Sequence, residues 1–235
     1  MDVNLEKLKG TMIAQLRKND IVANNLANIN ITGYKKDVVF LEVLKDETNP
    51  KVNIQTDFSQ GSLKQTDNPL DLAISGPGFF TIETDQGEAY TRDGHFTVDE
   101  QGVLRTSGGN AVLGQGGWIN LFTDEIKAGE VNVTRLGDIY VNDTLIDTLR
   151  ITDFEDYSGL RKIGENLFRV SPDVGFRSVE EPNVLQGNLE ESNVSAVQEM
   201  VNLIEIQRQF ESSQRIVKTI DRALGRAVNQ VSRFR

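Results

Sequence analysis

Apolar residues recur at alternating steps of three and four along the C-terminal end of the chain. Only Ser213 is polar in this row, which runs through Leu203, Ile206, Phe210, Ser213, Val217, Ile220, Leu224, Ala227, Val231 and Phe234. A spacing that averages 3.5 residues follows one side of a helix and is typical of a coiled-coil seam. A second, shorter row on the same helix is made of Val194, Val197, Val201 and Ile204. So long a helix with two apolar rows predicts a partner. The alternative is an ordinary amphipathic helix, but those usually run about 8–20 residues.

The N-terminal residues 2–28 also have helical spacing, with weaker contrast. Their apolar row is made of Leu5, Leu8, Met12 and Leu16. Polar residues interrupt it at Gln15, Asn19 and Asp20. We predict a second helix here, and we predict that the two rows together form an interface for assembly.

Asparagines crowd the end of this N-terminal helix, at Asn24, Asn25, Asn28 and Asn30. Asparagine is a poor helix former because its amide competes for nearby backbone groups. We interpret the cluster as amides that bond backbone across a close-packed joint, and we expect Thr32-Gly33 to end the helix. An ordinary polar loop is the alternative.

Beyond Leu70 the apolar period changes to two, and turn signals recur about every 8–12 residues, as in a small all-β unit. The pattern predicts strands at 79–82, 88–91, 95–98, 103–106, 111–113, 139–141, 144–146 and 148–154. Asn142-Asp143, between two of them, is typical of a hairpin turn. Residues 49–67 are polar and include Pro50, so we expect an extended connector there.

These patterns predict an α+β fold in which long N- and C-terminal helices form a coiled-coil-like domain, with a β-rich domain inserted between them. The predicted parts are the N-terminal helix at 1–36, the extended connector at 37–67, the β-rich domain at 68–190 and the C-terminal helix at 191–235.

The net charge of −10 is unevenly placed, since both ends are mildly basic and the middle is strongly acidic. A basic arm can bind nucleic acid, but these basic residues lie on helices with apolar rows, so we expect no nucleic-acid partner. No apolar run approaches the roughly 20 residues that span a bilayer, so we expect no membrane insertion. Charged residues at Asp2, Glu6 and Lys7 predict that there is no cleavable export signal.

The candidates for chemistry are few. The chain has no cysteine, and His95 is its only histidine, so it offers little for a nucleophile and base pair. The glycines at 108–117 lack the Lys-Ser/Thr of a phosphate-binding loop. The acidic residues Asp153, Glu155 and Asp156 lack the ligand spacing of a calcium loop. We expect no enzyme, no cofactor and no metal site.

Several motifs in order resemble those of the bacterial flagellar basal-body rod and hook protein family. The N-terminal signature is Asn24, Asn25, Leu26, Ala27 and Asn28, followed by Thr32, Gly33, Tyr34 and Lys35. The later matches are 56–61, 67–74, 78–80, 90–94, 187–190 and 192–194. Ile31 and Tyr34 depart from the usual residues, and the chain's basic end at 222–235 runs on further than is usual. The short connector between Phe40 and Thr66 is most like that of proximal-rod members, with distal-rod members next.

The resemblance implies a structural subunit that self-assembles into a hollow helical drive shaft and transmits torque from motor to hook. The paired terminal helices would form the inner tube, with the β-rich domain outside. Its partners would be copies of itself, other rod proteins and the flagellar type III export apparatus. It would lie in the periplasmic rod of the basal body, exported without a cleaved signal.

Two other classes remain open at this point. A β-domain adhesin or fibre module on a helical stalk would form a parallel trimer of one helix type. A β-rich hydrolase would use carboxylate pairs such as Glu83 and Asp85, or Asp153 and Glu155.

Overall fold

The computed structural model describes residues 2–42, 51–122, 130–172, 174–179 and 181–231. The chain divides into two compact units. The first, called the terminal unit below, comprises Met1–Ala27, Asp37–Asp57 and Val194–Arg235. The second, called the β unit, comprises Asn28–Lys36 and Phe58–Asn193.

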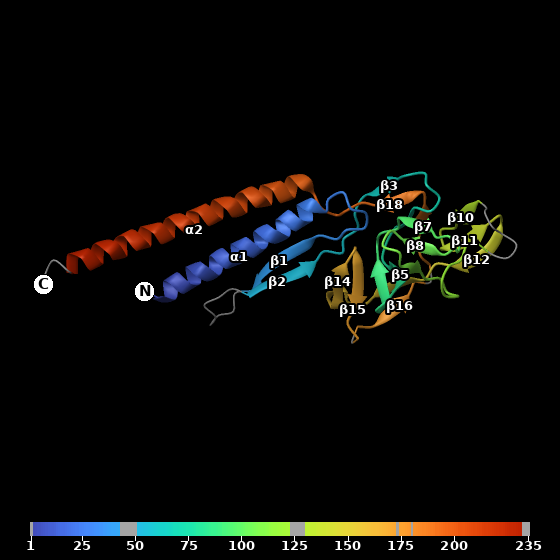
Figure 1. Ribbon diagram of the computed structural model, residues 1–235, viewed down its shortest axis with the longest axis horizontal. Coiled ribbons are helices and arrows are strands. Elements are labelled where there is room, and N and C mark those ends of the chain that lie inside the picture. Colours follow the sequence, from blue (N-terminus) through green and yellow to red (C-terminus); the bar gives the residue numbers. More distant parts are fainter. Residues whose placement is uncertain (1, 43–50, 123–129, 173, 180, 232–235) are drawn as a thin grey trace. The chain divides into compact units, whose positions relative to one another are not determined.

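The terminal unit contains two helices and a hairpin. The helices are α1 (Asp2–Ala27) and α2 (Ala196–Val231), and the antiparallel strands are β1 (Asp37–Glu42) and β2 (Lys51–Thr56). Figure 1 shows α1 beside both α2 and the hairpin. Ala14, Val22 and Ile206 are buried within this unit. Both helices lie in the stretches where the apolar rows predicted them.

The predicted fold class is nevertheless wrong. The described chain is mostly β, with two α-helices of unequal length, 26 and 36 residues, and eighteen strands. The terminal unit is not a coiled-coil-like helical domain, because α1 packs against β1 and β2 as well as against α2. Polar residues interrupt the apolar row of α1, so this row does not form a continuous seam for one partner helix. Part of the surface of α1 packs against the hairpin instead.

The stretch predicted as an extended connector contains a hairpin and a short strand. Asp37 pairs with Thr56 at one end of β1–β2, and Glu42 pairs with Lys51 at the other. Strand β3 (Leu63–Gln65) follows and pairs with β18 (Asn188–Glu190) of the β unit. Extended backbone was expected here, but its pairing into strands was not.

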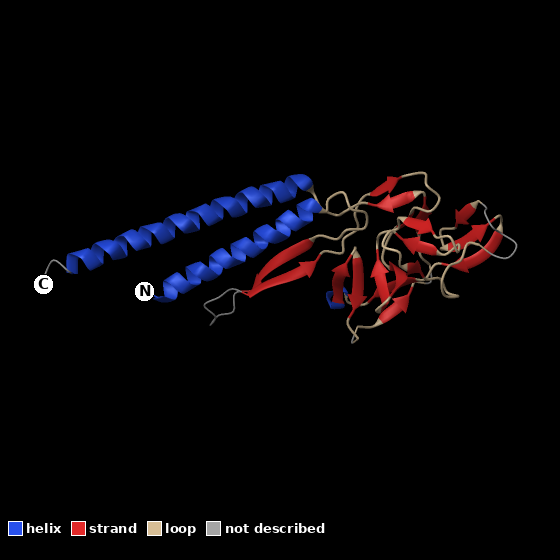
Figure 2. Ribbon diagram, in the orientation of Figure 1, coloured by secondary structure: helices blue, strands red, loops and turns tan. Residues whose placement is uncertain are grey.

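The β unit is built from short antiparallel strands, drawn as arrows in Figure 2. Its largest sheet has the order β14-β15-β6-β5-β9-β8-β7, and β13 joins it by pairing with β5 and β16. A second sheet has the order β10-β11-β12, and β17 pairs with β4. The remaining bounds are β4 (Leu72–Ile74), β5 (Phe79–Thr84), β6 (Gly87–Thr91), β7 (Phe96–Val98), β8 (Leu104–Thr106), β9 (Ala111–Val112), β10 (Val131–Val133), β11 (Asp138–Val141), β12 (Thr144–Thr148), β13 (Ile151–Phe154), a 3₁₀ turn at Tyr157–Gly159, β14 (Leu160–Gly164), β15 (Leu167–Val170), β16 (Phe176–Ser178) and β17 (Val184–Gln186).

Two apolar clusters hold this unit together. The larger gathers side chains from most strands around Ile82, Phe96 and Ile139. The smaller is aromatic, with Phe79 at its centre and Phe58, Phe154, Tyr157 and Phe168 around it. Ring centroids 5.8 Å apart for Phe79–Phe168 lie in the range where aromatic pairs attract. The unit therefore has a core of its own.

The predicted hairpin turn at Asn142-Asp143 is confirmed. Asn142 and Asp143 have φ values of 49° and 64°, which joins β11 to β12 by a turn with two positive φ angles. That geometry matches the twist of the flanking strands and is tolerated best by Asn, Asp and Gly.

No helix among the described residues is long and apolar enough to cross a membrane.

Candidate assembly interface

The long apolar row of α2 faces its own unit. Ile206 is 3% exposed, and the half-buried members of the row are Leu203, Phe210, Val217 and Ile220. From α1, Leu8 and Met12 are half-buried, whereas Leu16 is 50% exposed. The side chains of Leu5, Leu224 and Val231 lie outside the described residues. Within one chain, much of this row is thus already covered.

Ser213, the one polar member of the row, is buried, and its hydroxyl donates to the carbonyl of Gln209 at 3.0 Å. A serine hydroxyl bonded one turn back along its own helix needs no outside partner. The polar break in the row is therefore satisfied locally.

A second apolar row on α2 remains exposed. Its large side chains are 51–74% exposed, and they are Val197, Met200, Val201 and Ile204. With 3.6 residues per turn, this row and the row through Ile206 lie on opposite sides of α2. Ile13 and Leu16 on α1, and Phe40 and Ile54 on the hairpin, are also exposed. A row of exposed apolar side chains on one side of a helix, such as that of α2, is typical of a protein interface.

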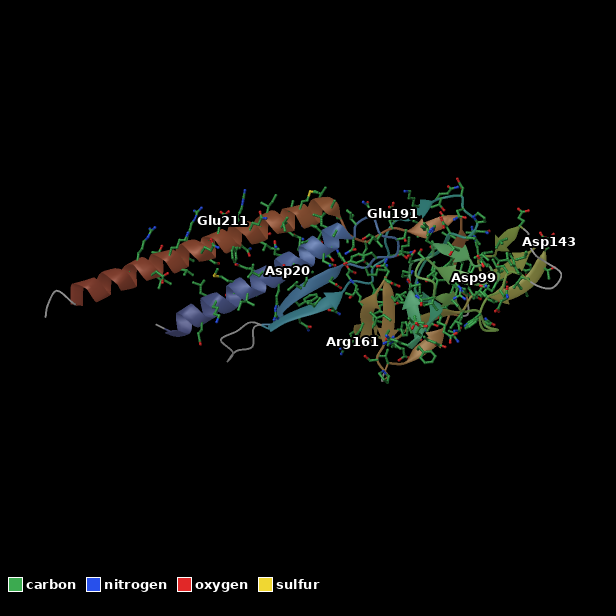
Figure 3. All side chains as sticks on the ribbon, in the orientation of Figure 1. Asp20, Asp99, Asp143, Arg161, Glu191 and Glu211 are labelled. Carbon is green, nitrogen blue, oxygen red and sulfur yellow. The ribbon has the colours of Figure 1, made fainter. Side chains whose placement is uncertain are left out.

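Further along α2, the same side of the helix becomes charged. Figure 3 shows long charged side chains standing out from α2, with Glu211 labelled. Glu211 lies 3.9 Å from Arg215, one turn on. Both side chains are largely exposed, so this pair contributes little to stability.

Asn25, from the asparagine cluster, bonds backbone as the sequence suggested. Its amide nitrogen donates to the carbonyl of Asp37 at 2.8 Å, and its amide oxygen accepts from the backbone nitrogen of Asp37 at 3.0 Å. Asn25 is 2% exposed. This reciprocal pair fixes the start of β1 against the end of α1. Of its neighbours, Asn24 and Ala27 are exposed, and Leu26 and Asn28 are half-buried.

The signature residues after α1 form part of the β unit. The backbone nitrogen of Gly33 donates to the carbonyl of Glu190 at 2.7 Å, and the Thr32 hydroxyl donates to Asp93 at 2.7 Å. Gly33 has a φ of 66°, and a Cβ there would lie 2.3 Å from the backbone nitrogen of Asp93. Any residue other than glycine would therefore push this segment off the β unit.

A buried ion cluster holds Lys35, two residues after Gly33. Its Nζ lies 2.5 Å from Oε1 of Glu190 and 2.7 Å from the carbonyl of Ser59. The other carboxylate oxygen of Glu190 accepts from Arg92 at 3.2 Å. Lys35 and Glu190 side chains are each 1% exposed. We call Lys35, Glu190 and Arg92 the ion clasp.

The ion clasp is bonded to the surrounding backbone, with Arg92 Nε as the one donor of the clasp that has no partner among the described residues. Glu190 Oε1 also accepts from the backbone of Gly61 at 3.0 Å, and Arg92 donates to the carbonyl of Gly76 at 2.8 Å. Burial lowers the pKa of Arg92, and the neighbouring charge of Glu190 works against that shift. The guanidinium also lies 5.0 Å from the ring centroid of Phe79. Buried charges are tolerated when paired and bonded in this way.

The start and the end of the β unit meet at this clasp. The side-chain oxygen of Asn193 accepts from the backbone nitrogen of Lys36 at 2.8 Å, and its backbone nitrogen donates to the carbonyl of Tyr34 at 3.3 Å. Lys162 Nζ donates to the carbonyl of Lys35 at 2.6 Å and lies 4.5 Å from the ring centroid of Tyr34. The signature residues thus fix where the chain enters and leaves the unit.

The candidate catalytic groups have structural contacts. The His95 ring nitrogen Nδ1 lies 2.8 Å from Asp71, which also accepts from Thr66 at 2.7 Å. Asp153 accepts from the Tyr157 hydroxyl at 2.7 Å and from Arg177 at 3.2 Å. Burial raises the pKa of Tyr157 to about 12, and its bond to Asp153 adds to the shift. Glu83 accepts from the indole nitrogen of Trp118.

Sequence reasoning missed the ion clasp. Lys35 and Glu190 are 155 residues apart, and no local pattern pairs them. The available signal was their position, because Lys35 closes the N-terminal signature and Glu190 ends the motif at 187–190. Two opposite charges that each lie inside a sequence motif are candidates for a buried ion pair.

Comparison with known families gives matches along the chain. Residues 5–35 match the family described as Flagella basal body rod protein. Residues 73–144 match the Flagellar hook protein FlgE/F/G D1 domain, and residues 185–230 match the Flagellar basal body rod FlgEFG protein C-terminal family.

Known proteins of similar sequence are rod proteins. The chain is 37% identical to the flagellar basal-body rod protein FlgF of Caulobacter vibrioides, over 83% of this chain and 84% of the relative. It is 34% identical to FlgG of Bacillus subtilis, over 90% of this chain and 92% of the relative. It is 32% identical to FlgF of Rhizobium meliloti, over 97% of each. The adhesin alternative finds no support in these relatives. The chain belongs to the flagellar basal-body rod protein family and is a structural subunit of the flagellar rod.

Proposed function

We propose that this subunit builds the rod by packing its terminal unit against the terminal units of neighbouring copies and of other rod proteins. One observation carries the proposal: the row of Val197, Val201 and Ile204 is more than half exposed, on the side of α2 opposite Ile206. Burying one such side chain is worth roughly 1.5–3 kcal/mol. Three of them on one helix side favour association strongly.

The apolar residues of the two helices have two roles in this proposal. Ile206, Phe210, Val217 and Ile220 hold α2 on its own unit, while Leu16 joins Ile13 on the exposed side of α1. A contact between different surfaces of successive copies repeats along an axis and gives an open helical assembly. Such an assembly would be a hollow shaft that carries torque from motor to hook.

The subunit is a mechanical part and not an enzyme, and this is supported by the structural contacts of His95, Asp153 and Glu83. We propose that the flagellar type III apparatus exports it without a cleaved signal, into the periplasmic part of the basal body. The names of the relatives support the basal body as its place.

Deletion of the gene, complemented by variants, tests the proposal in cells. Deletion should abolish rods in electron micrographs. A variant with serine at Val197, Val201 and Ile204 should also fail to build rods, because the exposed row loses its apolar area. The same protein, when purified, should keep the wild-type circular dichroism spectrum.

The matched control has serine at three exposed polar positions of α2, Gln207, Glu211 and Gln214. It should assemble normally. Normal rods in the first variant would contradict the proposed interface, and normal rods after deletion would contradict the rod function itself.

A further inference from the structure

Two sulfur-containing side chains lie within the described residues, Met12 on α1 and Met200 on α2, and the chain has no cysteine. Met12 is half-buried, whereas Met200 is 51% exposed. An oxidant in solution reaches an exposed sulfur atom more readily than one that is packed against other side chains. Met200 is therefore the more open of the two to oxidation.

Met200 belongs to the exposed apolar row of α2. Residues three and four apart on a helix are neighbours, so Val197 and Ile204 lie one turn to either side of Met200. They are 74% and 52% exposed. Their side chains, like that of Val201 beside them, are hydrocarbon. Met200 is thus the one side chain of this row that a mild oxidant converts to a polar group.

The oxidation itself is a simple oxygen transfer. Hydrogen peroxide breaks its O–O bond, passes one oxygen atom to Sδ of Met200 and leaves as water. The sulfur gives up two electrons, which reduce the peroxide. The product is methionine sulfoxide, a polar group in place of a flexible apolar one.

A sulfoxide at this position conflicts with burial of the row. Its oxygen accepts hydrogen bonds, and the side chains of Val197, Val201 and Ile204 have no donor for it. Burying a polar group without a partner costs free energy. The unmodified thioether has no such cost, and its three rotatable bonds let it adapt to the surface that covers it.

We propose that Met200 is an oxidation site of the unassembled subunit, and that conversion of its thioether to the sulfoxide by hydrogen peroxide keeps the subunit from joining the rod. The inference rests on the proposed packing of α2 against neighbouring subunits, which buries Met200 once the rod has formed. The free subunit is therefore sensitive to peroxide, and the assembled subunit is protected.

The purified full-length protein gives the first test. It is treated with hydrogen peroxide, and mass spectrometry of its peptides follows the gain of one oxygen atom at each methionine. Met200 should oxidise at least about threefold faster than Met12. Equal rates at the two residues would overturn the inference and leave the rod function untouched.

Assembled subunits give the second test. In isolated basal bodies, Met200 should oxidise at least about tenfold more slowly than in the free protein, because a neighbouring subunit covers it. Protection of Met200 would support both the inference and the proposed packing of α2. Equal rates in the two forms would contradict both.

Variants in cells that lack the native gene test the effect on assembly. Met200→Gln, which puts a polar group of similar length in the row, should reduce the number of rods per cell at least about twofold. Ile216→Gln is the matched control, because Ile216 is 49% exposed on α2 outside the row, and it should give the normal number. Both purified variants should keep the wild-type circular dichroism spectrum. Normal rods from Met200→Gln, with Met200 protected in wild-type basal bodies, would overturn this inference alone.

Growth with peroxide connects the modification to the loss of rods. When rods form in the presence of hydrogen peroxide, the fraction of rods lost should be at least about twofold smaller for Met200→Leu than for wild type, because leucine has no sulfur to oxidise. Each strain is compared with itself grown without peroxide. An equal fractional loss in the two strains would overturn the inference.

Discussion

At the scale of single residues, the most demanding feature is the charge buried in the ion clasp. Lys35 and Glu190 are removed from water, and the cost of that removal is offset only by their mutual contact and by bonds to Ser59, Gly61 and Arg92. The clasp therefore contributes little as a pair but penalises the loss of either member. The clasp thus favours a single arrangement of the first and last segments of the β unit, because other arrangements would leave a buried charge unpaired.

Lys35→Met should lower the free energy of unfolding of the β unit by about 3 kcal/mol, because it leaves Glu190 buried with one cation fewer. Urea unfolding followed by the fluorescence of Trp118, the only tryptophan, measures this directly. Lys64→Met, at an exposed position on β3, is the control and should change stability by less than about 0.5 kcal/mol. Equal stability of the two variants would contradict the clasp.

Tyr157 predicts a specific loss of stability at high pH. Its pKa in the folded chain is about 12, above the ordinary value of 10.0, because the ring hydroxyl is partly buried and bonded to Asp153. The folded state thus holds this proton more tightly than the unfolded state. The stabilisation is complete below pH 10 and is lost as pH rises from 10 to about 12.

The measurement is the melting temperature against pH for wild type and Tyr157→Phe. The wild type should fall more steeply between pH 10 and 12, since the variant has no proton to lose at this site. Tyr140→Phe, on β11, is the control and should keep the wild-type slope. Parallel curves for wild type and Tyr157→Phe would show that the hydroxyl is not held as described.

At the scale of elements, glycines in α2 and after α1 have opposite roles. Gly225 lies within α2 with open space where a Cβ would be, so Gly225→Ala should stabilise the helix by up to about 1 kcal/mol. Gly33→Ala should instead destabilise the β unit, because φ is positive and Asp93 occupies the space. Thermal melts by far-UV circular dichroism report both. A gain in stability for Gly33→Ala would refute the tight docking of the signature segment.

The elements also show how far sequence patterns reach. The alternation after Leu70 predicted β5 within two residues of its end, and turn chemistry predicted the β11–β12 hairpin. Those features depend on neighbours in the chain. The β1–β2 hairpin was missed because its two six-residue strands are separated by a polar stretch around Pro50 that holds no two-residue turn signal. The fold class was wrong because a heptad-like row shows that a helix side is covered but does not show by what.

Contacts between residues far apart in the sequence could not be predicted, because a local pattern does not show which distant residue lies opposite. Residue types alone do not tell that Lys35 meets Glu190, or that Thr32 meets Asp93. The sequence motifs marked these positions as special, and the structure supplies the cause, which is that they fix the chain where it enters and leaves the β unit. The exposed row of α2 is the opposite case, since its periodicity was visible in the sequence, but the surface that we propose covers it belongs to another subunit.

At the scale of the whole molecule, the question is which residues make up the smallest β unit that folds alone. The periodicity placed the β-rich domain at 68–190, but the unit also takes in 28–36, 58–67 and residues up to 193. Phe58 packs on Phe79 at a ring distance of 5.8 Å, and Glu190 is the partner of both Lys35 and Arg92. A fragment of 68–188 would lose these contacts while keeping Arg92 at a buried position.

Three fragments therefore should rank in stability, with 28–193 above 58–193 and 58–193 above 68–188. The middle fragment keeps Phe58 and Glu190 but lacks Lys35. The first step therefore removes the signature segment together with the β1–β2 hairpin, and the second removes Phe58, Glu190 and the β3–β18 strand pair. Melting by circular dichroism and by Trp118 fluorescence, with limited proteolysis, gives the order. Because an unpaired buried charge costs several kcal/mol, the 68–188 fragment should melt at least about 10 °C below 28–193. Equal melting of all three would mean that the β core is sufficient and that the signature residues serve only the neighbouring subunits.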